Sequence, residues 1–312
     1  MKDAPAPEAA TPEVAVIAPH LNQPEHLAAF LASLFAQDFD MGRAEVIIVD
    51  NGSRALPEAV VAPYPGVRLV AEATPGPGPA RNRGVALGRA PLIAFADADC
   101  RVAPDWLPAI LARFAADPGL GALGGDVRVF PAVAGRPSPA EAYEAVYAFR
   151  QQLYIETQGY SVTANLAVRR AVFEAVGGFG GIGIAEDNDW GNRARALGYP
   201  TVYAPEVRVE HPARATLAEV YAKWDRLISH HHATEARGLA GRARWTAKAL
   251  ALAASPLAEI PRVAGSDRLA SGRERRLAFQ ALVAVRLFRA RRMLAVMLSP
   301  AARSGTVGWN RR

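Results

Sequence analysis

Acidic residues follow two buried apolar runs of the chain, at the point where each run ends. Asp50 follows the run 46–49, and Asp97-Ala98-Asp99 follows the run 92–96. Open α/β sheets bind ligands at the carboxyl ends of their strands. Two carboxylates two residues apart can converge on one hard cation, such as a Mg²⁺ ion that shares phosphate oxygens with a substrate. The spacing therefore indicates a divalent-cation site, although a turn carboxylate is the alternative role for Asp50.

Other polar residues could take part in the same chemistry. Glu186 and Asp187 open a helix expected over 186–197, where they either cap the helix or supply a general base. Arg81 lies beside the Gly/Pro-rich loop 74–79 and could face phosphates, or it could occupy an exposed helix face. His211 follows an apolar run, as either a metal ligand or a structural histidine.

Strands that alternate with helices must position these residues. Apolar runs predict buried strands over 14–18, 46–49, 67–70 and 92–96, and helical spacing predicts helices from Pro24 and over 80–87 and 104–115. This alternation implies a parallel sheet with helices on both faces. In the second half we expect further elements: strands over 121–130, 163–168, 201–203 and 207–209, helices over 139–156 and 170–176, and mainly helices from 217, with an amphipathic one over 277–298.

Composition excludes several classes of protein. The chain has 312 residues, 51% of them apolar, which excludes disorder for most of its length. The single cysteine, Cys100, excludes a disulfide framework and a cysteine-rich zinc site. No apolar run reaches the roughly 18 residues of a spanning helix, and no signal peptide is recognisable, so we expect a cytoplasmic protein. Residues 1–13 are expected to form a disordered tail.

Charge is distributed unevenly along the chain. The net charge is +6, but residues 236–312 carry 16 basic and 3 acidic residues, or +13, which leaves −7 for residues 1–235. Such a basic extension suggests an anionic partner, for instance a membrane surface or a nucleic acid. A solvated arginine-rich surface is the alternative.

Taken in order, the segments resemble the family-2 glycosyltransferases, which have the GT-A fold. The resemblance covers about residues 14–212. The segments that carry it are 14–19 with Asn22, the helix through Leu34 with Gln37, 46–53, 80–84, 94–100, 163–170 with Phe173 and 177–179, 186–187 with Arg193 and 198–199, and 209–211.

The resemblance implies a fold and a domain organisation. The fold would be GT-A, with a Rossmann-like, mostly parallel sheet flanked by helices and a helical C-terminal extension. The catalytic domain would span 14–235, with a nucleotide-binding half over 14–100 and an acceptor half over 101–235. Residues 236–312 would form the basic helical extension.

The resemblance also implies roles for the residues that would bind the nucleotide sugar. Pro19 and Asn22 would border the nucleotide, and Asp50 would bind its base. Arg81 and Asn82 would line the donor pocket.

A second group of implied roles centres on the Asp-Ala-Asp motif. Asp97 would meet the ribose or the metal region, and Ala98 belongs to the same nucleotide-sugar-binding set. Asp99 would bind a divalent cation, Mn²⁺ or Mg²⁺, with His211 near the diphosphate and metal.

The implied reaction is inverting transfer of a sugar from a nucleoside-diphosphate sugar to a hydroxyl acceptor, either a glycan or a lipid-linked saccharide. Asp187 would be the catalytic base, with Glu186 beside it. The chain lacks a clear match to the Gln-x-x-Arg-Trp motif of processive synthases, so we expect a non-processive hexosyltransferase of polysaccharide biosynthesis. Two departures from the family pattern are His20, where an aromatic residue is usual, and Trp190, where a smaller apolar residue is usual.

Other functions remain open at this point. A non-catalytic nucleotide-sugar-binding scaffold would have the same fold, although it would be free to lose Asp99 or Asp187. A nucleotidyltransferase usually needs a glycine-rich loop with a lysine, and Pro19-His20-Leu21-Asn22 occupies that place. A nucleic-acid-binding protein would fit the basic extension, but no RNA motif or zinc finger supports it. Peripheral attachment to the inner face of the cell membrane through 236–312 is the hypothesis that suits a lipid-linked acceptor.

Overall fold

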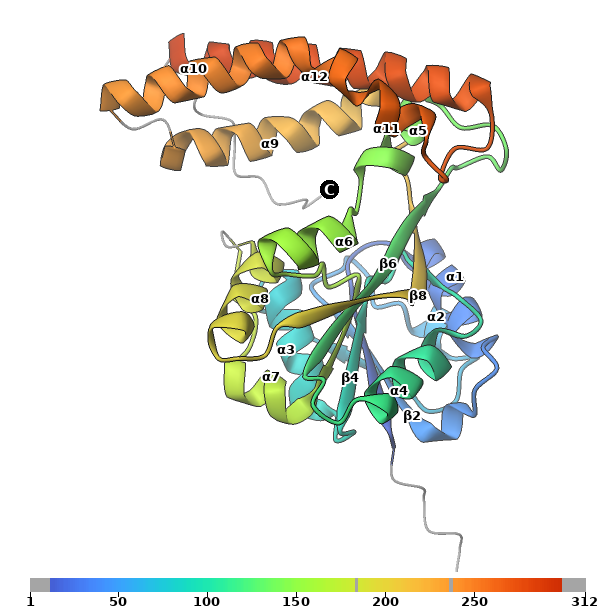
Figure 1. Cartoon of the computed structure of the whole chain (residues 1–312). Coiled ribbons are helices and arrows are strands. Elements are labelled where there is room, and N and C mark those ends of the chain that lie inside the picture. Colours follow the sequence, from blue (N-terminus) through green and yellow to red (C-terminus); the bar gives the residue numbers. More distant parts are fainter. Residues whose placement is uncertain (1–11, 183–184, 236–237, 299–312) are drawn as a thin grey trace, which may run out of the picture. The chain divides into compact units, whose positions relative to one another are not determined.

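The computed structural model describes residues 12–182, 185–235 and 238–298 (Figure 1). The chain forms two compact units. The strand unit comprises Met1–Arg128 and Phe149–His211, and the helical unit comprises Val129–Ala148 and Pro212–Arg312. Most of the expected disordered tail over 1–13 lies outside the described residues.

The strands and helices follow one another closely along the chain. The strands are β1 (Val14–His20), β2 (Ala44–Asp50), β3 (Val67–Ala71), β4 (Leu92–Ala96), β5 (Arg101–Val102), β6 (Ala122–Phe130), β7 (Asn165–Arg169) and β8 (Thr201–Pro212). The α-helices are α1 (Pro24–Phe35), α2 (Glu58–Val61), α3 (Pro77–Leu87), α4 (Trp106–Ala116), α5 (Pro139–Tyr147), α6 (Gln151–Leu153), α7 (Arg170–Val176), α8 (Glu186–Ala196), α9 (Leu217–Glu235), α10 (Gly238–Ala254), α11 (Ile260–Ala264) and α12 (Gly272–Leu298). Short 3₁₀ or π segments are η1 (Met41–Arg43), η2 (Tyr154–Gln158) and η3 (Ser255–Glu259).

The strands form one eight-stranded mixed sheet in the order β3-β2-β1-β4-β7-β6-β8-β5. Strands β3, β2, β1 and β4 run parallel, as the alternation with helices predicts. The second half of the chain differs, because β7 pairs antiparallel with both β4 and β6. The parallel region therefore ends at β4, and β4 delivers the Asp-Ala-Asp motif at its carboxyl end.

Side chains alternate along β1 and fill a separate apolar cluster on each face of the sheet. Val14, Val16 and Ala18 pack with residues of α1 and α4, whereas Ile17 packs with residues of α3, α7 and α8. Figure 1 shows the same arrangement, with α1 and α4 on one side of the sheet and α3, α7 and α8 on the other. Because both faces of the sheet are covered, the residues of β1 from Val14 to Ala18 are all buried, and the strand appears in the sequence as a continuous apolar run.

Three expected elements differ in the structure. The helix expected over 80–87 begins at Pro77, because proline fits the first turn of a helix. The helix expected over 139–156 breaks after Tyr147, where Ala148 is extended and Phe149 has a φ of 45°. The two strands expected over 201–203 and 207–209 form the single strand β8.

The helical unit has its own apolar core. Buried residues of α5, α9 and α12 form one cluster, which includes Tyr143, Val220 and Leu282, and residues of α9, α10 and α12 form a second around Trp245. The apolar stripe expected over 277–298 thus packs inside this unit along α12. No helix of the described ranges 12–182, 185–235 and 238–298 combines the length and the apolar character needed to cross a bilayer.

The units divide the chain differently from the ranges expected from the sequence. Residues 129–148 and 212–235 belong to the helical unit, whereas the expected catalytic range 14–235 included them. The expected catalytic range was drawn from the positions of the sequence motifs, whereas the two units are defined by which residues pack together.

Gly84 allows α3 to approach the sheet closely. A Cβ at this position would lie 2.4 Å from Cγ2 of Ile17, a buried β-branched residue that cannot move aside. Although alanine is the better helix former, we expect Gly84→Ala to destabilise the protein by about 1–3 kcal/mol. Calorimetric unfolding checks this. Gly272→Ala is the control, since a Cβ there meets nothing within 4 Å, and an equal loss in both variants would contradict the steric explanation.

Candidate active site

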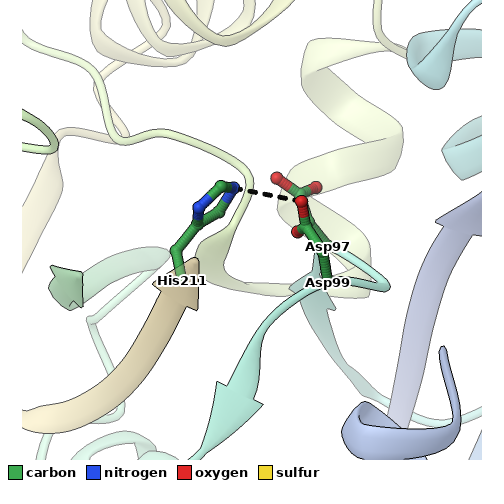
Figure 2. Close-up of side chains that lie close together, drawn as sticks. All are labelled: Asp97, Asp99 and His211. Carbon is green, nitrogen blue, oxygen red and sulfur yellow. Dashed lines mark ion pairs between the residues drawn. The ribbon is translucent and has the colours of Figure 1, made fainter. Parts of the chain in front are cut away.

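Asp97, Asp99 and His211 form a three-residue cluster at the carboxyl end of β4 (Figure 2). One ligand atom from each lies within 4.8 Å of the others, and Nε2 of His211 is 3.3 Å from Oδ2 of Asp99. Pairing of Arg101 in β5 with Glu210 in β8 brings His211 to the motif. The structure therefore brings together the two residues predicted to bind metal, together with Asp97.

Asp99 has the environment of a metal ligand. Burial raises the pKa of its carboxyl group, Asp97 raises it further, and His211 opposes both. Oδ1 of Asp99 is buried, and nothing among the described residues donates a hydrogen bond to it. A divalent cation would supply the missing partner and compensate the charge that burial disfavours. The residues present therefore fit a hard divalent cation held by oxygen ligands and one imidazole.

Arg81 links this cluster to the acidic start of α8. Its guanidinium is buried, and it lies 2.5 Å from Asp97 through Nη2 and 3.3 Å from Glu186 through Nη1. The residue thus occupies neither an exposed helix face nor a free phosphate-binding position. It joins side chains from α3, from the end of β4 and from α8.

Asp187 lies beside this network. Oδ1 of Asp187 accepts a hydrogen bond of 3.3 Å from the backbone N–H of Thr163. Burial raises the pKa of Asp187 to about 7, and Glu186 raises it while Arg81 lowers it. A carboxyl group that titrates near neutral pH can accept a proton in the range where enzymes work.

Asp50 and His20 form a buried pair at the ends of β2 and β1. Nε2 of His20 accepts from the backbone N–H of Gln23 at 3.2 Å, so Nδ1 carries the proton and donates to Oδ1 of Asp50 at 2.9 Å. Oδ2 of Asp50 accepts from the backbone N–H groups of Gly52 and Ser53. Burial acts to raise the pKa of Asp50, but the hydrogen bonds from Ser53 and His20 outweigh it and lower the pKa. Asp50 therefore stabilises the turn after β2, and its contact with the nucleotide base stays a prediction.

Asn22 and Pro19 lie at the same edge of the sheet. Asn22 adopts a φ of 53°, accepts a hydrogen bond from the backbone N–H of Arg54 through Oδ1, and donates its own backbone N–H to Ser53 Oγ. Pro19 is the register partner of Val49. The loops that follow β1 and β2 are thereby joined into one surface.

Asn82 and Ala98 have little side chain available for a ligand. The amide of Asn82 makes two hydrogen bonds of 2.9 Å, one in each direction, with the backbone of Phe179. Ala98 points into the apolar core next to Cys100. Cys100 is fully buried, and burial together with Asp97 and Asp99 raises the pKa of its thiol well above the usual value.

Asn51 shapes the site, although the sequence did not single it out. Asn51 accepts from Gly76 N–H and donates to the carbonyls of Glu72 and Thr74, which holds the Gly/Pro-rich loop. Trp190, which departs from the family pattern, is buried among aromatic rings and donates to the Gly177 carbonyl, so it belongs to the core. The only available signal for Asn51 was its place next to Asp50.

Comparison with known proteins gives a consistent result. The sequence profile described as Glycosyl transferase family 2 matches residues 15–177. The chain is 30% identical to Glycosyltransferase AglE of Haloferax volcanii over 209 residues, which are 65% of this chain and 68% of AglE. It is 35% identical to Succinoglycan biosynthesis protein ExoO of Rhizobium meliloti over 105 residues, 33% of this chain and 30% of ExoO.

Solved structures show the same fold at low sequence identity. Mannosyltransferase PcManGT from Pyrobaculum calidifontis, solved with GDP-Man and Mn²⁺, has a TM-score of 0.54 and 20% identity, over 96% of this chain and 78% of that one. S. aureus TarS with UDP-GlcNAc has a TM-score of 0.51 and 16% identity, over 88% and 90%. These similarities, together with the matching profile, confirm the expected GT-A fold.

We expect Asp99→Asn to weaken Mn²⁺ binding by at least about 10–100-fold, because one of the three ligand groups loses its charge. Changing a residue that only hydrogen-bonds to a metal ligand already costs about this much affinity. Titration calorimetry with a nucleoside diphosphate present measures this. Affinity of the unaltered chain should also fall as the pH is lowered, since the raised pKa of Asp99 lets protons compete with the metal.

Asp38→Asn provides the matched control. Asp38 is an exposed carboxylate of the same unit and lies outside the cluster. The control should bind Mn²⁺ like the unaltered chain. Equal affinity in Asp99→Asn would contradict a cation site at this cluster.

Proposed function

Because the chain belongs to glycosyl transferase family 2 and is a glycosyltransferase, we propose that it transfers a sugar from a nucleoside-diphosphate sugar to a hydroxyl acceptor with inversion. The observation that carries the proposal is the connection of two acidic groups through Arg81. One is the Asp97-Asp99-His211 cluster, and the other is the Glu186-Asp187 pair at the start of α8. A glycosyl transfer needs both a group that neutralises the leaving diphosphate and a base that activates the acceptor.

Asp99 and His211 would hold a divalent cation, Mn²⁺ or Mg²⁺, with Asp97 beside it. When bound, such a cation neutralises the charge on the departing diphosphate. Support for Mn²⁺ comes from PcManGT, whose structure contains this ion with GDP-Man. Asp97 is also held by Arg81, so its carboxylate has a fixed position next to the cation ligands.

Asp187 would be the catalytic base, with Glu186 as its neighbour. The Asp187 carboxylate takes the proton of the acceptor hydroxyl as the oxygen attacks the anomeric carbon, from the face opposite the leaving diphosphate. One base and one displacement invert the anomeric configuration. The hydrogen bond from Thr163 N–H fixes one oxygen of Asp187, which leaves the other oxygen for the acceptor.

The donor would lie along the ends of β1, β2 and β4. Pro19 and Asn22 would border the nucleotide, and Arg81, Asn82 and Ala98 would shape the pocket from behind. We infer that Asp50 acts on the base through the loop that it organises with His20, since both of its oxygens already accept hydrogen bonds. PcManGT binds GDP-Man and TarS binds UDP-GlcNAc, so both nucleotide classes are candidate donors.

The acceptor is proposed to be a glycan or a lipid-linked saccharide, extended by one sugar per encounter. Support comes from the similarity to ExoO, whose name places it in succinoglycan biosynthesis. We also propose peripheral attachment to a membrane through the basic extension 236–312, which carries +13. The catalytic range 14–235 and this extension remain our proposed functional division of the chain.

A thermal-shift screen of nucleoside diphosphates and sugar nucleotides, with and without Mn²⁺, tests the donor. A ligand that binds only the native state adds about 2.7 kcal/mol to the free energy of unfolding at 100 times its Kd, and this raises the melting temperature. We expect one nucleotide class to give a metal-dependent shift that is lost in Asp99→Ala. No shift with any nucleotide would count against the proposed donor site.

Replacing the proposed base should nearly abolish turnover. We expect Asp187→Asn to lower kcat by about 10²–10⁴-fold, the usual contribution of general base catalysis. In the unaltered chain, the single-turnover rate should rise with pH through about 7, because Asp187 must lose its proton before it can act and its pKa is about 7. Anomeric configuration of the product, measured by NMR, tests inversion.

Asp189→Asn is the control for this experiment. Asp189 lies on the same helix but pairs with Arg193 at 2.9 Å. The control should keep both the rate and the pH dependence. A rate that does not change between pH 6 and 8 in the unaltered chain would exclude Asp187 as the base.

A further inference from the structure

A cavity of about 460 Å³ lies within the helical unit, where residues of α9, α10, η3 and α12 surround it. This volume is within the range of small-molecule sites. None of the side chains discussed for the active site lines it. The cavity therefore needs an explanation apart from glycosyl transfer.

Most of the residues that line the cavity are apolar. Ile228, Trp245 and Met293 are buried and line it. The indole N–H of Trp245 donates to the Met293 carbonyl at 2.9 Å, so the polar group of this tryptophan is already satisfied. A ligand that enters this cavity gains by removing apolar surface from water, which favours a hydrocarbon chain.

Cationic side chains also line the cavity. Arg289 lies over the ring of Trp224, with its guanidinium carbon 3.4 Å from the ring centroid, and Lys248 and Arg286 contribute two further charges. No acidic residue is among the described lining residues. Such an arrangement of cations next to an apolar chamber is complementary to a phosphate attached to a hydrocarbon chain.

Glu259 pairs with one of these cations, Arg286, and is itself shared with other groups. Glu259 accepts from Arg286 at 2.9 Å and from the hydroxyl of Tyr147 at 3.1 Å, and it also pairs with Arg262. One carboxylate thus faces two guanidinium groups. The Glu259 carboxylate is therefore shared between Arg286 and Arg262.

The elements around the cavity expose large apolar side chains. Leu250 of α10 is 60% exposed, Leu257 of η3 is 73% exposed and Leu287 of α12 is 45% exposed. Exposed apolar residues beside arginines are typical of surfaces that lie in the interface of a bilayer. A soluble anion would make no use of these side chains, whereas a lipid in a membrane would.

We propose that this cavity binds one anionic membrane lipid, with its hydrocarbon chain against the lining side chains of Trp245 and Met293 and its phosphate against Lys248, Arg286 and Arg289. The proposal goes beyond attachment by general charge, because it names a single site for a lipid molecule. It is also independent of the donor site, and either can fail without the other.

Binding of a short-chain lipid tests the proposal on the full chain. Dioctanoyl-phosphatidylglycerol is titrated by calorimetry below its critical micelle concentration, with dioctanoyl-phosphatidylcholine and glycerol phosphate as comparisons. We expect saturable binding of one phosphatidylglycerol, at least about tenfold weaker binding of the zwitterionic lipid, and none of glycerol phosphate at the same concentrations. Equal binding of the two lipids, or of glycerol phosphate, would overturn the proposal.

Paired variants separate the site from the rest of the surface. Ala251→Phe fills the cavity from an exposed lining position of α10, and Ala243→Phe adds the same ring to an exposed position of that helix outside the lining. Only the first should weaken lipid binding, by at least about tenfold. Lys248→Gln should weaken it and Arg242→Gln should not. Circular dichroism and the melting temperature without ligand verify that the variants are folded.

Other occupants of the cavity give different results. A dimer that forms without lipid and dissociates in Ala251→Phe, observed by sedimentation, would overturn the proposal and assign the cavity to a second copy of the chain. Lipid binding that appears only after residues 299–312 are removed would assign it to that segment. Equal binding by Ala251→Phe and Ala243→Phe would also overturn it.

Discussion

The buried guanidinium of Arg81 is the interaction on which the proposed site depends. Asp97 and Glu186 come from distant parts of the sequence and both pair with it. Its charge also lowers the pKa of Asp187, against burial and the neighbouring carboxylates that raise it. Without the positively charged guanidinium at this position, the carboxylates of Asp97, Glu186 and Asp187 would repel one another in a poorly hydrated region. Arg81 is therefore a condition for placing the proposed base next to the proposed metal ligands.

The mixed sheet explains how these groups reach one another. The parallel strands β1, β2 and β4 end at the same edge, and this places the loops after them side by side. The antiparallel strands of the second half then return to this edge, and the pairing of β8 with β5 sets His211 next to Asp99. A wholly parallel sheet would have needed a further crossover to bring a histidine to the same place.

Much of this arrangement could be predicted from the sequence, because apolar runs that end in acidic residues mark strand ends. Asp97 and Asp99 could be placed from this local pattern, whereas Asp187 was placed at the start of a helix and connected to the site only by the resemblance to a known family. The partners of amide side chains could not be predicted in the same way. Asn82 bonds to Phe179 and Asn51 to residues of the Gly/Pro-rich loop, and both choices depend on loops whose path is set by tertiary packing.

Long-range packing also explains the differences in the elements. Residues 139–156 have helical composition throughout, yet the chain turns at Phe149, whose ring lies 4.7 Å from that of His211. The pairing of β8 with β5 likewise depends on a two-residue strand, too short to stand out in the sequence. Local helix and strand preferences were sufficient to predict most individual helices and strands. They were insufficient to predict the points where the chain changes direction.

The single cysteine of the chain gives the experimenter a practical advantage. Cys100 is sealed in the core, and its thiolate form is strongly disfavoured, so maleimide reagents will react slowly with the native protein. A cysteine introduced at an exposed position would carry a spectroscopic label selectively, with no need to remove the natural thiol from beside the proposed metal ligands. With two such labels, one on the strand unit and one on the helical unit, the distance between the labels could be measured during turnover.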